Sequence, residues 1–158
     1  SVAPVVGVFE CGNHDKVLGY ALAQVLSAWY RNCDDAEVIV PTGLDLDDGT
    51  YTAYQFHDVA IFGHHGHTKK GAELTRIFAC LFPEMWGACR HRACFTGHYH
   101  HARQFGDFGG MEILQTRSPS RKTDYEQRLG FTDDAQTLEG FVFRQGQGLA
   151  HHIRAMMG

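Results

Sequence analysis

The sequence predicts an α/β domain in which β-sheet and helices pack as layers of a sandwich. Apolar runs of strand length at residues 5–9, 59–62 and 93–96 are typical of buried strands. Two other segments, 16–31 and 70–82, carry apolar residues at spacings of three and four, which is typical of amphipathic helices. Strands and helices therefore alternate first, and short β-like segments dominate the remainder of the chain.

The first elements are a strand at Val5–Phe9, ended by Gly12, and a helix at Lys16–Arg31. The helix aligns six apolar side chains on one face, the pattern with which a surface helix usually packs on a core. These side chains are Leu18, Ala21, Leu22, Val25, Leu26 and Trp29.

A tight hairpin is expected next. Short strands at Glu37–Val40 and Tyr51–Phe56 flank the dipeptide Asp48-Gly49, which is typical of such turns. The acidic run 45–48 evokes a calcium loop, but no glutamate follows at the required spacing, so we interpret it as part of the hairpin.

The later elements begin with the buried strand Val59–Phe62. The helix Lys70–Phe82 follows and is limited by Pro83. The remaining strand-like segments are Ala93–Thr96, Gln104–Phe108, Met111–Gln115 and Gly140–Arg144, with a turn at Gly109-Gly110.

Length and charge limit the possible functions. With 158 residues, 44% of them hydrophobic, and no linker, we expect residues 1–158 to form a single domain with its own core. The formal net charge of −4 argues against a generic nucleic-acid coat protein. Residues 69–128, however, hold 10 basic and 6 acidic side chains, a sum of +4. A basic middle in an acidic chain suggests that an anionic ligand binds there.

Cellular location is constrained by what the chain lacks. No apolar run approaches the roughly 18–20 residues that span a bilayer. The first residues lack the basic and long apolar regions of a signal peptide. Five cysteines, an odd number without a Cys-x-x-Cys pair, fit reduced thiols. We therefore expect a cytoplasmic protein without a membrane partner.

Histidine is unusually abundant, with 11 in the chain and seven between His64 and His101. Imidazole is a common metal ligand, and ligand sites of open α/β sheets lie at the carboxyl ends of strands. Most of these histidines follow the predicted strands, so we expect the loops that carry them to converge on one edge of a sheet. They are His14, His64, His65, His67, His98, His100 and His101.

Three motifs contain side chains of the types that bind metal ions or transfer protons. Gly12-Asn13-His14-Asp15 offers an amide oxygen, a proton donor and a carboxylate, although a helix-capping turn explains it equally well. Gly63-His64-His65-Gly66-His67 is a glycine-flanked histidine loop, with a solvated polar loop as the alternative. In Gly97-His98-Tyr99-His100-His101, an extended backbone would turn His98 and His100 to one side.

Together these motifs resemble the C-terminal half of the calcineurin-like metallophosphoesterase family, and its phage-type members in particular. That family shows Gly-Asn-His-Asp/Glu, then a histidine often within His-Gly-His, then Gly-His-x-His. This chain has all three in that order, and a Trp86-Gly87 run precedes the last one. The resemblance covers about Val5 to Arg144.

The resemblance implies the layered metallophosphoesterase fold and a centre for two metal ions. It implies that Asn13, His65 and His98 are ligands of the second metal and that His100 is a ligand of the first. His64 lies close enough to His65 that the choice between the two stays open.

The resemblance also implies that His14 is the catalytic histidine, which contacts the phosphate or protonates the leaving oxygen. Asp15 would be the partner that orients His14. The sequence departs from the family in having no Asp-x-His and no Gly-Asp-x-x-Asp motif, which supply most of the first metal site. We expect that the N-terminal half has been removed or lies on another polypeptide, or that the chain is a non-catalytic derivative. The initial serine favours a fragment.

Phosphoester hydrolysis needs a nucleophile at neutral pH and neutralisation of phosphate charge, and two metal ions about 3.5–4 Å apart supply both. Mixed imidazole and oxygen ligands suit divalent Mn, Fe, Zn, Ni or Co. Arg103, Arg117 and Arg121 are candidates for contacting a phosphodiester, with a solvated charged face as the alternative.

The sequence is therefore interpreted as a metal-dependent phosphoesterase that acts on a phosphomonoester or phosphodiester, with nucleic acid as one candidate substrate. A non-catalytic scaffold and a single-metal-binding fragment are the alternatives. We interpret Cys89, His91 and Cys94 as structural, because a fourth zinc ligand is missing. His151-His152 is interpreted as tail.

Overall fold

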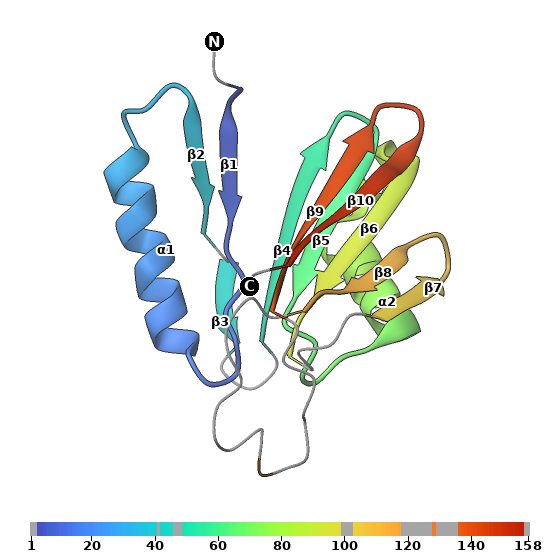
Figure 1. Ribbon diagram of the computed structural model, residues 1–158, viewed down its shortest axis with the longest axis horizontal. Coiled ribbons are helices and arrows are strands. Elements are labelled where there is room, and N and C mark those ends of the chain that lie inside the picture. Colours follow the sequence, from blue (N-terminus) through green and yellow to red (C-terminus); the bar gives the residue numbers. More distant parts are fainter. Residues whose placement is uncertain are drawn as a thin grey trace.

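A computed structural model describes residues 3–40, 42–45, 49–98, 103–117, 128 and 136–156 of the chain. Within these residues it contains three helices and a mixed five-stranded sheet, together with smaller strand pairs (Figure 1). The predicted α/β class is confirmed. No helix in the described part of the chain is both long and apolar enough to cross a membrane.

The first part of the structure, which we call the N-terminal unit, comprises β1 (Val5–Val8), α1 (Lys16–Tyr30) and β2 (Ala36–Ile39). The strands β1 and β2 pair in parallel, from Val5 opposite Ala36 to Val8 opposite Ile39. The helix α1 lies along one side of the pair (Figure 1). In the described residues neither strand pairs with the central sheet.

The central sheet has the strand order β4-β5-β6-β8-β7. Strands β5, β6 and β8 are parallel to one another, whereas the outer strands β4 and β7 are antiparallel to their neighbours. A short strand, β3, pairs with the start of β4. The bounds are β3 Thr42–Asp45, β4 Gly49–Phe56, β5 Val59–His64, β6 His91–Thr96, β7 Arg103–Asp107 and β8 Glu112–Gln115.

The core lies between the central sheet and the two helices that join β5 to β6, α2 (Gly71–Leu81) and α3 (Pro83–Ala88). Phe62 of β5 stacks on Phe78 of α2, with ring centroids 4.6 Å apart. Trp86 of α3 stacks on the same Phe62 ring at 6.0 Å. The continuous apolar runs of β5 and β6 supply the sheet side of this core, so the burial predicted for these two strands is confirmed.

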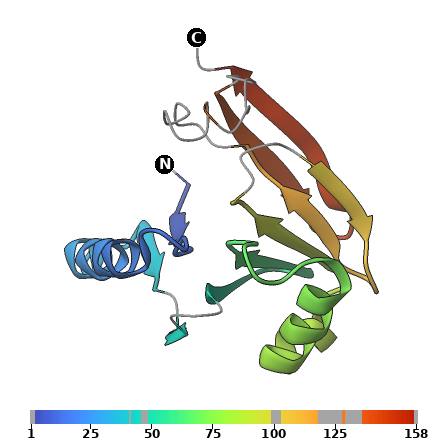
Figure 2. The ribbon, with the colours of Figure 1, turned by 90° about the horizontal axis from the view of Figure 1, so that it is seen from below.

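The opposite face of the sheet contacts a hairpin formed by β9 (Thr137–Arg144) and β10 (Gly148–Met156) (Figure 2). Phe95 of β6 packs against Phe141 of β9, with ring centroids 4.7 Å apart. At the hairpin turn, the Gly146 N–H donates to the Asp58 carboxylate at 3.0 Å. Successive residues of a strand face opposite sides of the sheet. Cys94 therefore packs in the core beneath the helices, and Phe95 packs against the hairpin on the other face.

Two predictions about the N-terminal unit are wrong. The first strand is not buried, since Val5 is 60% and Val8 is 42% exposed. The apolar stripe of α1 faces outward, where Trp29 is 79% exposed, and the buried residue of the helix is Ala23. A two-stranded sheet offers little surface to cover, so five of the six predicted stripe residues stay exposed and only Leu26 among them is partly buried.

Three local predictions also need correction. The strand that pairs with the start of β4 is β3, with Asp45 opposite Gly49, and not the segment near Glu37, which pairs with β1. Asp48 of the predicted turn lies outside the described residues. Pro83 does limit α2, but it also begins α3, because proline fits the first turn of a helix. His151 and His152 are not a tail, since they lie within β10 and His152 stacks on Phe141.

The five cysteines, all of which are among the described residues, form no disulfide in the structure. Cys89 and Cys94 are buried in the core, in line with the structural interpretation.

Candidate functional site

The carboxyl ends of three parallel strands meet at one edge of the central sheet. His64 ends β5 opposite Thr96 of β6, and Thr96 lies opposite Gln115 of β8. The Thr116 N–H donates to the Thr96 carbonyl oxygen at 2.9 Å, so the segment after β8 still lies beside the end of β6. His65, His98 and Arg117 follow these three ends, so the convergence expected for the second and third motifs is confirmed.

The first motif reaches this edge from a different sheet. The Asn13 side-chain oxygen Oδ1 lies 3.0 Å from Nε2 of His65, although the two residues are 52 positions apart. Asn13 follows β1, which belongs to the N-terminal unit and not to the central sheet. The expected meeting of Asn13 and His65 is therefore found, but across two sheets instead of along one edge.

Gly12 lies close to both Asp15 and His65. A Cβ atom at position 12 would lie 2.6 Å from Oδ1 of Asp15 and 3.3 Å from Cε1 of His65. The nearer atom is the tip of an exposed side chain, so a larger residue at position 12 would displace the Asp15 carboxylate and tighten the contact with the His65 ring. A substitution at Gly12 would therefore change the surroundings of His65.

His64 and His65 have different surroundings. His64 is fully buried, its ring stacks on Tyr51 at 4.9 Å, and its Nδ1 accepts the Gly66 N–H at 2.9 Å. These contacts place His64 in the packing beneath the loop. His65 lies instead 3.0 Å from Asn13, so of the two histidines it is the one placed beside the first motif.

Gly66 shapes the loop that carries both rings. Its φ of +93° lies in the region that glycine adopts at no steric cost, and a Cβ there would approach Thr96 at 3.3 Å. The Gly97 N–H donates to the His65 carbonyl oxygen at 3.1 Å, which ties the second motif to the third.

His98 adopts a φ of +64°, which is uncommon for a residue with a side chain. Its ring meets the His65 ring edge-on, with centroids 5.1 Å apart. The extended backbone expected for the third motif is not found at His98, because β6 ends at Thr96 and the chain turns. His100 lies outside the described residues.

His67 is a further member of the cluster that the sequence interpretation did not assign to the site. Its ring lies 5.4 Å from His65 and 6.0 Å from His98, measured between centroids, and both its ring nitrogens are buried. The signal was present in the sequence, since His67 completes the His-Gly-His triplet.

Burial lowers the pKa of His65 to about 4, and the neighbouring His98 and His67 add to the effect. Its imidazole is therefore neutral at neutral pH and keeps a lone pair on one ring nitrogen. A neutral imidazole is the form that binds metal ions.

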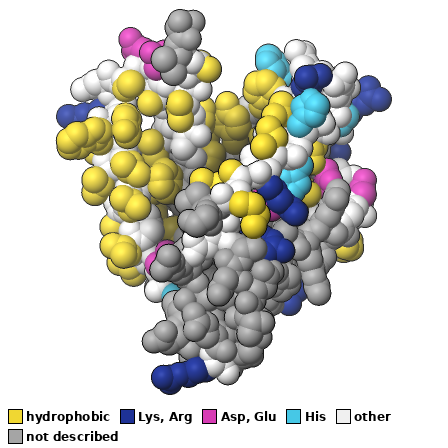
Figure 3. Space-filling model, in the orientation of Figure 1, with side chains coloured by type: hydrophobic (Ala, Val, Ile, Leu, Met, Phe, Trp, Pro, Cys, Tyr) yellow, Lys and Arg dark blue, Asp and Glu magenta, His cyan; other side chains and the backbone are white. Residues whose placement is uncertain are grey.

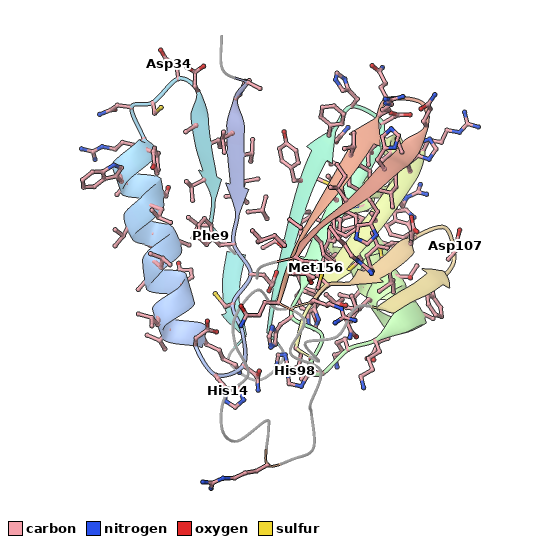
Figure 4. All side chains as sticks on the ribbon, in the orientation of Figure 1. Phe9, His14, Asp34, His98, Asp107 and Met156 are labelled. Carbon is pink, nitrogen blue, oxygen red and sulfur yellow. The ribbon has the colours of Figure 1, made fainter. Side chains whose placement is uncertain are left out.

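His14 lies at the same end of the molecule as His98 (Figure 4). The side chains of His14 and Asp15 are both exposed. Asp15 is the residue that precedes α1, but its side chain makes no capping hydrogen bond. The Asp15 carboxylate lies close to Gly12. Its negative charge raises the pKa of His65 and so opposes part of the lowering by burial. The proposed orientation of His14 by Asp15 stays a prediction.

The three arginines are only partly described. Arg117 is half-buried and follows the carboxyl end of β8. The Arg103 backbone begins β7 opposite Gln115, which puts it at the same edge, and its side chain is outside the described part of the structure. Arg121 also lies outside the described residues.

A cavity of about 330 Å³ adjoins His65 between the N-terminal unit and the central sheet. Its walls include Val8, Ile61 and Phe95, and Glu10 is the acidic residue among those that line it. The Thr52 hydroxyl donates to the Glu10 carboxylate at 3.0 Å across this boundary.

Asn13 Oδ1 and His65 Nε2 lie at hydrogen-bond distance, and an amide oxygen and an imidazole nitrogen are also donor types that divalent transition ions accept. In the described residues no three His, Cys, Asp or Glu side chains form a ready ligand group. The fit therefore rests on an amide oxygen and a neutral imidazole, with His98 beside them.

Comparison of the chain with protein-family models, with curated proteins and with solved structures finds no match. The resemblance to metallophosphoesterases thus depends on the three motifs and on the positions of their residues.

Proposed function

We propose that this chain carries the imidazole and amide part of a metal-dependent phosphoesterase centre of the metallophosphoesterase type. The observation that carries the proposal is the 3.0 Å approach of Asn13 Oδ1 to His65 Nε2. Three motifs that lie far apart in the chain supply an amide oxygen and imidazoles to one place. A solvated loop or a simple helix cap has no need of this juxtaposition.

In this proposal Asn13, His65 and His98 hold a divalent ion of Mn, Fe, Zn, Ni or Co. When bound, such ions neutralise phosphate charge and acidify water at phosphoesterase centres. Asn13 contributes an uncharged oxygen, so the ligand set leaves the positive charge of the ion available to the phosphate.

His14 is the proposed general acid. Asn13 and His14 are consecutive in a turn, so their side chains diverge, and His14 is the exposed one. An imidazole outside the ligand set can give a proton to the leaving oxygen at neutral pH. Arg117 supplies positive charge at the same edge for the phosphate of the substrate. A phosphodiester such as nucleic acid is one candidate substrate.

In this proposal full activity needs the metal-binding carboxylates of the Asp-x-His and Gly-Asp-x-x-Asp motifs, which this sequence lacks. A second polypeptide segment that brings them would complete a two-ion centre. The alternative is a protein that binds a single ion without turnover.

The first test is calorimetric titration of the metal-free protein with Mn²⁺ or Zn²⁺. We expect one ion to bind more readily than a pair, and Asn13→Ala and His65→Ala to weaken that binding. His57→Ala is the matched control, since His57 is an exposed imidazole in the turn before β5. Two equivalent tight sites, or equal affinity in all variants, would contradict the proposed ligand set.

The second test separates His14 from the ligands. In a preparation that hydrolyses nitrophenyl phosphoesters, His14→Ala should lower kcat by roughly 10²–10⁴-fold without loss of metal. The loss should shrink for substrates with better leaving groups, because these need less protonation. An inactive His14→Ala protein that has also lost its metal would show that His14 is a ligand.

A further inference from the structure

The cavity beside His65 has the chemical character of a small-molecule site. It lies where the N-terminal unit meets the central sheet, and its volume of about 330 Å³ is within the range of ligand pockets. Figure 3 shows hydrophobic side chains on both of these parts of the molecule. Ligand pockets often lie where two units meet, and they combine apolar walls with a few polar groups. The side chains that line this cavity therefore indicate what it would bind.

The apolar walls of the cavity come from both units. Val8 belongs to β1, whereas Ile61 and Phe95 lie on the neighbouring strands β5 and β6 of the central sheet. Phe95 is half-buried, and its packing against Phe141 holds the ring in place at the cavity. Aromatic side chains stack on other flat rings, so this wall suits a planar ring better than a flexible alkyl chain.

A carboxylate is held in position within these apolar surroundings. The hydroxyl of the buried Thr52 donates to Oε2 of Glu10 at 3.0 Å. At Gly63 a Cβ atom would collide with this hydroxyl and lie 3.3 Å from Glu10 Oε2, so glycine leaves room for the pair. An ionised carboxylate accepts hydrogen bonds at about four positions and donates none. The contact with Thr52 therefore leaves Glu10 able to accept from a ligand.

We propose that the cavity binds a planar aromatic ring that carries an amino group, with the ring against Phe95 and the amino group donating to Glu10. This inference rests on the proposed function in one respect, because the ring would be the organic part of the phosphoester whose phosphate lies at His65. His65 lines the same cavity, so one small molecule can reach both places. Cytosine and adenine have this chemistry, since each carries an exocyclic amino group.

The lining indicates a small molecule and not a polynucleotide. The described residues that line the cavity include no lysine or arginine, and Glu10 gives them a negative charge. Grooves that bind single-stranded nucleic acid are positively charged along the path of the backbone. A mononucleotide-like phosphoester needs positive charge only at its phosphate, where the proposed ion would supply it.

The test measures the affinity for free nucleosides by NMR titration, without added metal ion. We expect cytidine to bind roughly 10–100-fold more tightly than uridine, which presents a carbonyl oxygen to Glu10 in place of the amino group. Glu10→Gln should remove this preference, because an amide both donates and accepts hydrogen bonds. Glu37→Gln is the matched control, since Glu37 is an exposed carboxylate on β2 of the same unit.

A second pair of variants blocks the cavity. Val8→Trp should fill it and abolish cytidine binding, and since Val8 is 42% exposed the larger side chain can be accommodated without unfolding. Val5→Trp is the matched control, because Val5 is 60% exposed on the same strand and is not among the described residues that line the cavity. Circular dichroism checks that both variants are folded.

Cytidine binding that Val8→Trp abolishes and that Glu10→Gln makes unselective supports the proposal. No binding of cytidine, equal affinity for cytidine and uridine, or binding insensitive to Val8→Trp overturns it. Tighter binding of an oligodeoxycytidylate than of cytidine, or binding of choline without binding of cytidine, also overturns it, because these would show a polymer site or a quaternary-ammonium site. The metal centre fails separately, in the Mn²⁺ titration, and selective cytidine binding by a protein that binds no Mn²⁺ would still support the ring site.

Discussion

The helices α1 and α2 have the same kind of sequence pattern but opposite environments. In α2, Leu74 and Phe78 of the apolar stripe are fully buried against the central sheet. In α1, the corresponding stripe points away from β1 and β2, and its largest member, Trp29, is almost entirely exposed. Periodicity therefore indicates that a helix has an apolar face, but the amount of sheet available decides whether that face is covered within the chain.

The largest expected difference between the two regions is in stability. Phe78→Ala should lower the free energy of unfolding by about 3–5 kcal/mol, because the ring stacks on Phe62 and leaves a cavity. Trp29→Ala in dilute protein should change it by less than about 0.5 kcal/mol. Urea unfolding of the two variants measures both values. Similar losses in both would show that α1 is packed within the monomer.

Metal binding should depend on one residue from each region. If the proposed ligand set is right, His65→Ala removes the imidazole donor of the central sheet and should lower the affinity for Mn²⁺ roughly 100-fold, whereas Asn13→Ala removes a weaker oxygen donor and should lower it about 10-fold. Calorimetric titration gives both affinities. If only His65→Ala had an effect, the N-terminal unit would not share in the site.

A smaller effect is expected at the hydrogen bond that joins the regions beside the cavity. Thr52→Val removes the hydroxyl that donates to Glu10 and preserves the shape of the side chain. We expect a loss of about 1 kcal/mol in the free energy of unfolding. Combining it with Glu10→Ala, which removes the acceptor, in a double-mutant cycle isolates the pair, and additive effects of the two changes would show that the contact contributes nothing.

The smallest expected effect lies within α1. Gly19→Ala adds a methyl group 3.5 Å from Sγ of Cys11, an ordinary contact, in a helix interior where alanine is preferred to glycine. Stability should rise by about 0.5–1 kcal/mol, measured as the urea midpoint. Gly66→Ala, at a φ of +93°, should do the reverse. A loss for Gly19→Ala would mean that α1 packs more tightly on its unit than the structure shows.

Much of the site could be anticipated from local patterns. The strands β5 and β6 are continuous apolar runs, and the polar loop after each run lies at the same edge of the sheet. The proximity of His65 and His98 could therefore be predicted from the sequence. The backbone turn at His98 could not be anticipated, because an L-residue rarely adopts positive φ and nothing in Gly97-His98-Tyr99 requires it.

Pairing between distant segments was harder to predict. The membership of β1 in a separate sheet depends on its contact with β2, about 30 positions later, and no local signal specifies that choice. The strand β10 was missed because its two adjacent histidines suggested a tail. In the structure its pairing with β9 and the stacking of His152 on Phe141 stabilise a segment with little apolar alternation.

The contact between Asn13 and His65 has a consequence for local unfolding. It joins the N-terminal unit to the central sheet at a boundary where the described hydrogen bonds between side chains are few. An ion held there would act as a cross-link between two cooperative units, so its binding energy would oppose their separation. Amide hydrogens of β1 and α1 should then exchange with solvent more slowly when metal is bound, while those of β5 and β6 change little.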